Sequence, residues 1–153
     1  MDSLSDGIRA GSRSSVAPAQ SGVPTARDVM ATDLVVFRPD QLVKDAIAVL
    51  LKQRISGAPV VGPGFTLLGV LSELDCLRVL ASSAYDGEPL NRDRRVSELM
   101  STSTTTIEPS TDLYAIAHMF LDHRVRRLPV LQGNRVVGQV SRRDVLRAME
   151  NMW

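Results

Sequence analysis

One pattern of residues occurs twice along the chain at an almost constant spacing, and this repetition constrains the fold more than any other feature. Identical residues first recur 70 positions apart: Met30 and Met100, Thr32 and Thr102, Pro39 and Pro109, Arg54 and Arg124, Pro59 and Pro129. One residue is then lost in a turn, and the spacing becomes 69: Gly69 and Gly138, Ser72 and Ser141, Asp75 and Asp144, Leu77 and Leu146, Arg78 and Arg147. Because one such unit buries too little apolar surface to be stable alone, we expect the two repeats to share a core.

The apolar periodicity predicts the element order β-α-β-β-α in each repeat. In the first repeat, short β-branched runs predict strands at 34–37, 58–61 and 67–71. Apolar residues at helical spacing predict a helix over about 42–53 and a second one from about 73 toward 82. The fold class is therefore α/β (α+β), with two tandem repeats related by a pseudo-twofold axis.

Turn and capping residues support these boundaries. The segment Gln132-Gly133-Asn134 separates two apolar runs and is typical of a hairpin turn. Thr25 and Asp28 fit a capping box for a short helix that ends near Met30. Asp112 is a suitable N-cap for the first helix of the second repeat.

The expected domain organisation follows from the repeats and from composition. Residues 1–24 are rich in Ser, Gly, Ala and Pro and lack a periodic apolar pattern, so we expect a mobile tail with no role in folding. The first repeat spans 25–84, a polar linker 85–95, and the second repeat 96–150. Residues 25–150 together are expected to form one joint module.

Composition excludes several classes of protein. The longest apolar run, 46–51, is too short to cross a membrane, and the 44% hydrophobic content is enough for a core. The single cysteine, Cys76, excludes an internal disulfide and fits a reducing compartment, so a cytoplasmic location is expected. Its place on the apolar face of a predicted helix favours a buried structural thiol over a nucleophile.

Charge distinguishes the two otherwise matched repeats. The window 124–147 holds seven arginines against one acid, Asp144, and so carries a net charge of +6 in a chain whose total is +1. In the first repeat, the acids Glu73 and Asp75 balance Arg54 and Arg78. The second repeat is therefore better suited to an anionic ligand.

The paired M-x-T segments, the Pro before each first helix, the Pro-Val strands and the two G-h-h-S-x-x-D motifs resemble CBS domains, and the tandem arrangement resembles a Bateman module. The resemblance covers residues 25–150. It implies an adenine-nucleotide sensor, with AMP or ATP as the expected ligand and no cofactor. Such pairs are usually attached to enzymes, channels or transporters, and since no effector domain is attached here we expect a stand-alone module with an unknown regulated partner.

The resemblance also implies composite sites, each made from the Ser and Asp of one repeat and strand residues of the other. The first expected site joins Ser141 and Asp144 to four residues of repeat one: Val35, Ile55, Ser56 and Ala58. The second joins Ser72 and Asp75 to three residues of repeat two: Thr105, Val125 and Leu128. In both, the carboxylate would accept hydrogen bonds from a ribose diol, and the helix N-terminus would favour phosphate.

We expect the first site to be the stronger one. Arg126-Arg127-Leu128-Pro129 resembles the phosphate-binding His-Arg-Leu-Pro segment in gamma subunits of AMP-activated kinase, whereas repeat one has Ser56-Gly57 at the corresponding place. Arginine presents a planar fork of donors that suits phosphate. Glu73, beside the other helix N-terminus, would repel phosphate, so that site is expected to be empty or to take a less charged adenosine ligand.

Simpler interpretations stay open at this point. Ser-x-x-Asp before an apolar run is also a plain capping motif, and Arg142 and Arg143 fit a solvated helix face. If the sites have decayed, the chain is a structural or interaction module whose basic window binds an acidic protein or, less expectedly, nucleic acid.

Other activities have little support in the sequence. No P-loop or activated nucleophile is present, so an enzyme is not expected, and the spacing of His118 and His123 does not favour a metal site. We expect a homodimer, because two-repeat modules of this family commonly pair. The first helices after Pro39 and Pro109 offer apolar faces for this contact.

Overall fold

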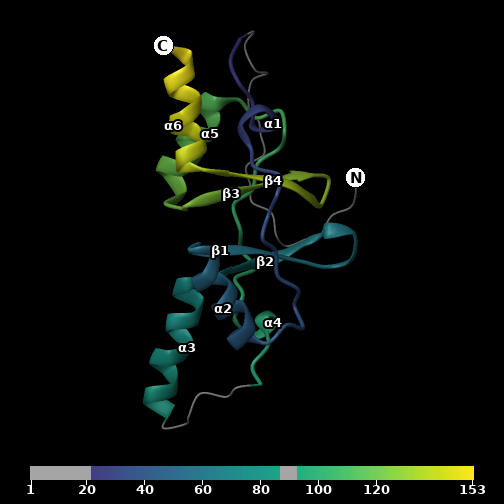
Figure 1. The fold of residues 1–153 in the computed structure, drawn as a ribbon, viewed down its shortest axis with the longest axis vertical. Helices are drawn as coiled ribbons and strands as arrows, with labels where there is room; N and C mark the ends of the chain where they lie inside the picture. Colours follow the sequence, from purple (N-terminus) through teal and green to yellow (C-terminus); the bar gives the residue numbers. More distant parts are fainter. Residues whose placement is uncertain (1–21, 87–92) are drawn as a thin grey trace. The chain divides into compact units, whose positions relative to one another are not determined.

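The structure is a computed structural model that describes residues 22–86 and 93–153. The elements in chain order are α1 (Ala26–Val29), α2 (Val43–Gln53), β1 (Gly57–Val61), the 3₁₀ turn η1 (Pro63–Phe65), β2 (Leu67–Ser72), α3 (Glu73–Asp86), α4 (Val96–Leu99), α5 (Leu113–His123), β3 (Arg127–Gln132), β4 (Arg135–Ser141) and α6 (Arg142–Met152) (Figure 1). The chain forms two compact units. One is continuous, Val35–Thr102, and the other joins the described residues up to Leu34 with Ser103–Trp153. We call them the Asp75 unit and the Asp144 unit.

The Asp75 unit is built on an antiparallel hairpin of β1 and β2, in which Pro59 lies opposite Val70. Gly64, in the connecting turn, has a φ of 70°, a left-handed conformation that favours glycine. The hairpin shares a core with the helices of the unit, made of Phe37, Val43, Ala46, Leu50, Ala58, Val60, Leu71, Val96 and Leu99. Cys76 and Val79 of α3 pack against this core.

The Asp144 unit repeats this plan with β3 and β4, where Pro129 lies opposite Gln139. The turn expected at 132–134 is confirmed, and its Gly133 has a φ of 67°. The core joins α1, α5, α6 and the hairpin through Ala26, Ile107, Leu113, Ile116, Phe120, Leu128, Val130, Val140, Val145 and Ala148. Asp112 caps α5 as expected, accepting a 2.9 Å hydrogen bond from the Ala115 backbone nitrogen.

The first strand of each repeat is shorter than the sequence predicts. Instead of a strand over 34–37, a single residue, Phe37, forms a parallel bridge to Val60. The Phe37 nitrogen donates to the Pro59 carbonyl at 2.9 Å, and the Val61 nitrogen donates to the Phe37 carbonyl at 2.9 Å. Ile107 makes the equivalent bridge to Val130. The chain turns away soon after each bridge, at Pro39 and its counterpart, which limits the pairing to one residue.

The first segment of each sequence repeat packs in the compact unit that holds the rest of the other repeat. Residues of α1 and Ala31 belong to the Asp144 unit, where Ala31 bridges Gln139 of β4. Residues of α4 and Ser101 belong to the Asp75 unit, where Ser101 bridges Val70 of β2. The sequence repeats, 25–84 and 96–150, therefore have different boundaries from the compact units. The Asp75 unit includes α4 and Ser101 from the start of the second repeat, and the Asp144 unit includes α1 and Ala31 from the start of the first.

Two glycines permit these bridges. A Cβ atom at Gly69 would lie 2.6 Å from the Ser101 carbonyl oxygen, and one at Gly138 would meet the Met30 side chain and lie 3.1 Å from the Ala31 carbonyl oxygen. Because the contacted oxygens are backbone atoms, the segments have little freedom to move away. The Gly of each G-h-h-S-x-x-D motif therefore serves close backbone packing.

The last residues of the expected N-terminal tail contact the Asp144 unit. The Pro24 carbonyl accepts a 2.9 Å hydrogen bond from the Leu113 nitrogen, and Val23 packs against the core of the Asp144 unit. Both residues therefore take part in the fold of this unit. Residues 1–21 of the expected tail and 87–92 of the expected linker lie outside the described residues. Within the described part of the chain, no helix has the length and apolar character needed to span a membrane.

Candidate functional site

The Ser-x-x-Asp motif of the second repeat forms a capping box at the start of α6. The Asp144 Oδ2 atom accepts hydrogen bonds from the Ser141 nitrogen at 2.8 Å and the Ser141 hydroxyl at 3.0 Å. The Ser141 hydroxyl in turn accepts from the Asp144 nitrogen at 3.2 Å. On the other carboxylate oxygen, Oδ1, Asp144 accepts a 2.9 Å bond from Arg147. The capping interpretation of the motif is confirmed, and the carboxylate is held rigidly by it.

The first repeat builds the same box at the start of α3 and adds one bond. Asp75 Oδ2 accepts from the Ser72 nitrogen at 2.8 Å and the Ser72 hydroxyl at 2.9 Å, and Oδ1 accepts from Arg78 at 3.0 Å. The additional donor is the Ser101 hydroxyl, 2.9 Å from Oδ1. A carboxylate has about four acceptor positions, and these four bonds fill them. The Asp75 side chain is 4% exposed, against 16% for Asp144.

Both motif aspartates bond to an arginine of their own helix, but the second motif has a further arginine beside it where the first has a glycine. Arg127 at the start of β3 lies opposite Ser141 in the hairpin register, whereas Gly57 lies opposite Ser72. Opposed residues in an antiparallel pair project on the same face, about 5 Å apart, so Arg127 stands beside the capping box. Arg126 is exposed.

The first turns of the two helices also differ in charge. Arg142 opens α6, and its guanidinium donates two hydrogen bonds to the Val125 carbonyl, at 3.0 and 3.3 Å, rather than being only solvated. At the start of α3 stands the exposed acid Glu73. The N-terminus of α6 is thus the more favourable one for an anion.

The expected composite sites draw on both compact units. Ser72 and Asp75 lie in the Asp75 unit together with the partners expected for Asp144, which are Val35, Ile55, Ser56 and Ala58. The Asp144 unit contains Ser141, Asp144, Arg126 and Arg127. It also contains the partners expected for Asp75, which are Thr105, Val125 and Leu128. Ala58 and Leu128 are buried in the cores of their own units. The joining of either composite site stays a prediction.

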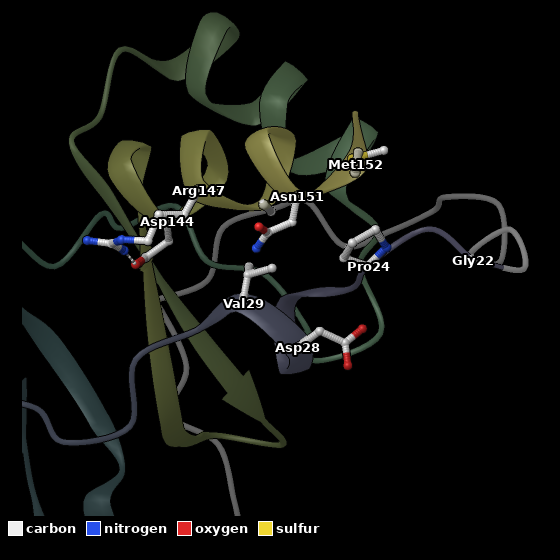
Figure 2. A pocket seen from close by; sticks show the side chains of 9 residues that line it. Gly22, Pro24, Asp28, Val29, Asp144, Arg147, Asn151 and Met152 are labelled. Carbon is white, nitrogen blue, oxygen red and sulfur yellow. Dashed lines mark hydrogen bonds and ion pairs between the residues drawn. The ribbon is translucent and has the colours of Figure 1, made fainter.

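Asp144 also lines a pocket of about 550 Å³ inside its own unit (Figure 2). Helix α6 contributes Asp144, Arg147 and Asn151 to one wall, and Asp28 and Val29 of α1 form the opposite wall. Of the residues predicted to bind a ligand, only Asp144 lines this pocket. Sequence reasoning identified Asp28 as a capping residue but missed its place here, because nothing in the spacing connects α1 with the last helix of the chain.

Two further expectations concern Cys76 and metals. Burial of the Cys76 thiol, together with the nearby carboxylates of Asp75 and Glu73, raises its pKa above the ordinary value for cysteine. A raised pKa disfavours the thiolate, which agrees with a structural thiol rather than a nucleophile. Within residues 22–86 and 93–153, no group of three or more His, Cys, Asp and Glu side chains is placed to hold a metal ion.

Comparison with known sequences identifies the family. A model of the CBS domain matches residues 26–82 and again residues 96–151. The chain is 28% identical over 156 residues to the chloroplastic CBS domain-containing protein CBSX2 of Arabidopsis thaliana, covering 86% of this chain and 66% of CBSX2. It is 28% identical over 121 residues to the CBS domain-containing protein YhcV of Bacillus subtilis, covering 79% of this chain and 82% of YhcV.

Solved structures support the same assignment. The crystal structure of CBSX2 in complex with AMP has a TM-score of 0.73 and 29% sequence identity, covering 84% of this chain and 98% of that one. The CBS domain pair of protein MJ0100, in complex with 5′-methylthioadenosine and S-adenosyl-L-methionine, has a TM-score of 0.71 at 19% identity, covering 86% and 99%, and this likeness concerns the fold alone. With the family model matched in both repeats, the chain belongs to the CBS domain family and consists of a pair of CBS domains.

Proposed function

We propose that this chain is a regulatory module that binds an adenine nucleotide, AMP or ATP, at Asp144 and passes its occupancy to a partner protein through a change of shape. The observation that carries the proposal is the setting of Asp144. Its carboxylate is held in place by Ser141, lines a pocket and makes three of about four acceptor contacts within the described chain. The role requires no catalytic step.

The chemistry around Asp144 suits each part of such a ligand. The remaining acceptor position of the carboxylate fits a ribose hydroxyl, which donates a hydrogen bond. Arg127, opposite Ser141, and its neighbour Arg126 offer guanidinium donors to phosphate oxygens. CBSX2, which is 29% identical to this chain, has been crystallised with AMP.

Titration calorimetry with AMP, ATP and S-adenosylmethionine tests the proposal directly. We expect AMP or ATP to bind wild type with a measurable heat and the Asp144→Ala variant to bind much more weakly. If wild type binds none of the three at millimolar concentration, the proposal fails. The interaction module then takes its place, in which Asp144 is only a helix cap and the arginines contact an acidic macromolecule.

We also propose that the module is a homodimer. Exposed apolar side chains occupy matching places in the two units: Leu51 of α2 and Leu121 of α5 are 74% and 76% exposed, and Leu77 of α3 and Leu146 of α6 are 56% and 61% exposed. In the Asp75 unit these helices border an apolar groove of about 720 Å³. A second copy presents the same faces, as a twofold interface requires. Light scattering that gives a mass near 16.7 kDa at micromolar concentration would exclude the dimer.

A further inference from the structure

The two units differ in the side chain of the residue that pairs with the strand before the motif. Ser101 and Ala31 occupy equivalent places, each forming a pair of backbone hydrogen bonds with the edge of the strand before the motif. Ser101 exchanges two 2.9 Å bonds with Val70. Ala31 exchanges bonds of 2.9 and 3.0 Å with Gln139. The backbones therefore correspond, and the side chains are a hydroxymethyl group in one unit and a methyl group in the other.

This difference changes the hydrogen bonding of the aspartate. The Ser101 hydroxyl donates to Asp75 Oδ1 at 2.9 Å, next to the bond from Arg78 on the same oxygen. With Ser72 holding the other oxygen twice, the carboxylate of Asp75 has no acceptor position left. Asp144 accepts the equivalent bonds from Ser141 and Arg147, but the methyl group of Ala31 is not a hydrogen-bond donor.

We infer that residue 101 and its counterpart 31 determine which of the two aspartates accepts a ligand. The Ser101 hydroxyl occupies on Asp75 the position that a ribose hydroxyl would otherwise take, whereas on Asp144 the described residues leave that position to a ligand, because Ala31 supplies no donor. The inference rests on the proposed function, and it adds a cause for selectivity that is independent of the arginines. It also predicts that exchanging these two small side chains alters the sites without touching any residue proposed to bind the ligand.

The decisive variant is Ala31→Ser, compared with Ala31→Val by calorimetry with AMP. The serine supplies a donor that competes for the open position of Asp144, so AMP affinity should fall roughly tenfold, as expected for one bond to a charged group. Valine adds more bulk without a donor and should leave the affinity within about twofold of wild type. Equal affinities for wild type and Ala31→Ser would overturn the inference, and so would equal losses in the serine and valine variants, which would indicate a steric effect.

The reciprocal variant, Ser101→Ala, tests the other unit with adenosine as the probe, because adenosine carries no phosphate for Glu73 to repel. Opening the position on Asp75 should raise the binding stoichiometry from about one to about two per chain. A stoichiometry that stays at one would overturn the role given to Ser101. If wild type binds neither AMP nor adenosine, the proposed function itself has failed. That outcome is distinct from one in which wild type binds and the exchanges at 31 and 101 change nothing.

Discussion

The Asp75 and Asp144 units present the same capping box with two different surroundings. In both, a serine and an aspartate three residues later fix the start of a helix, with bonds that match to within 0.1 Å. Around Asp75 stand Ser101, Gly57 and Glu73, whereas the corresponding residues around Asp144 are Ala31, Arg127 and Arg142. The repeated motif gives both units the same local fold, and we propose that its neighbours determine whether it is also available to a ligand.

The largest effect is expected from Asp144→Ala. Loss of a hydrogen bond to a charged group costs about 1.5–3 kcal/mol, so the affinity for AMP should fall about tenfold to a hundredfold in calorimetry. Circular dichroism should show a folded protein. The matched control is Asp75→Ala, and equal losses in affinity from both variants would remove the asymmetry between the units.

A second variant, Arg127→Ala, separates phosphate recognition from ribose recognition. Because a guanidinium contacts phosphate oxygens, the loss of affinity should be largest for ATP, about tenfold or more, smaller for AMP, and close to nothing for adenosine. Arg78→Ala, in the other unit, serves as a control that removes one arginine from the protein without affecting the proposed site. A uniform loss across the three ligands would show that Arg127 does not act through phosphate.

Asp75→Ala should affect stability rather than binding. The variant leaves the Ser101 hydroxyl and the α3 cap without an acceptor, and the free energy of unfolding should fall by about 1–3 kcal/mol in urea titrations. AMP affinity should stay within about twofold of wild type. A large loss of AMP binding in this variant would mean that Asp75 shares the ligand and that its four internal bonds do not exclude it.

The smallest effect concerns the N-terminal segment that completes the Asp144 unit. Removing residues 1–21 should leave the melting temperature unchanged, in line with the composition of that segment. Removing residues 1–24 should lower it by a few degrees, because Val23 and the Pro24 carbonyl contact the core and α5. Differential scanning calorimetry distinguishes the two truncations, and equal melting temperatures would show that these contacts contribute nothing.

Most of the fold was accessible from the sequence because it depends on local and repeated patterns. The hairpins, both helix pairs, the cap at Asp112 and the box at Thr25 and Asp28 are recorded in spacings of a few residues. The single-residue bridge at Phe37 was not, because an apolar run of four looks the same whether one or all of its residues pair. The exchange of first segments was equally hidden, since each repeat reads as continuous.

The candidate site was less accessible. The sequence singled out Asp75 and Asp144 as a pair, and charge alone favoured Asp144. The bond from Ser101 to Asp75 could not be anticipated, because it crosses from one sequence repeat to the segment that opens the next. The pocket wall formed by α1 opposite α6 could not be anticipated for the same reason. The Ser101–Asp75 bond and this wall both depend on pairing between segments far apart in the sequence, which no local pattern indicates.

The exchange of segments also has a consequence for how the chain is assembled during synthesis. The Asp75 unit is continuous, so all of its parts have left the ribosome once residue 102 is clear of the exit tunnel. The Asp144 unit begins first and finishes last, since Ala31 must wait for Gln139 near the end of the chain. Contacts of such high sequence separation form slowly. Until residue 139 has left the exit tunnel, Ala31 therefore lacks its partner in β4, and it stays accessible to a chaperone or a neighbouring nascent chain.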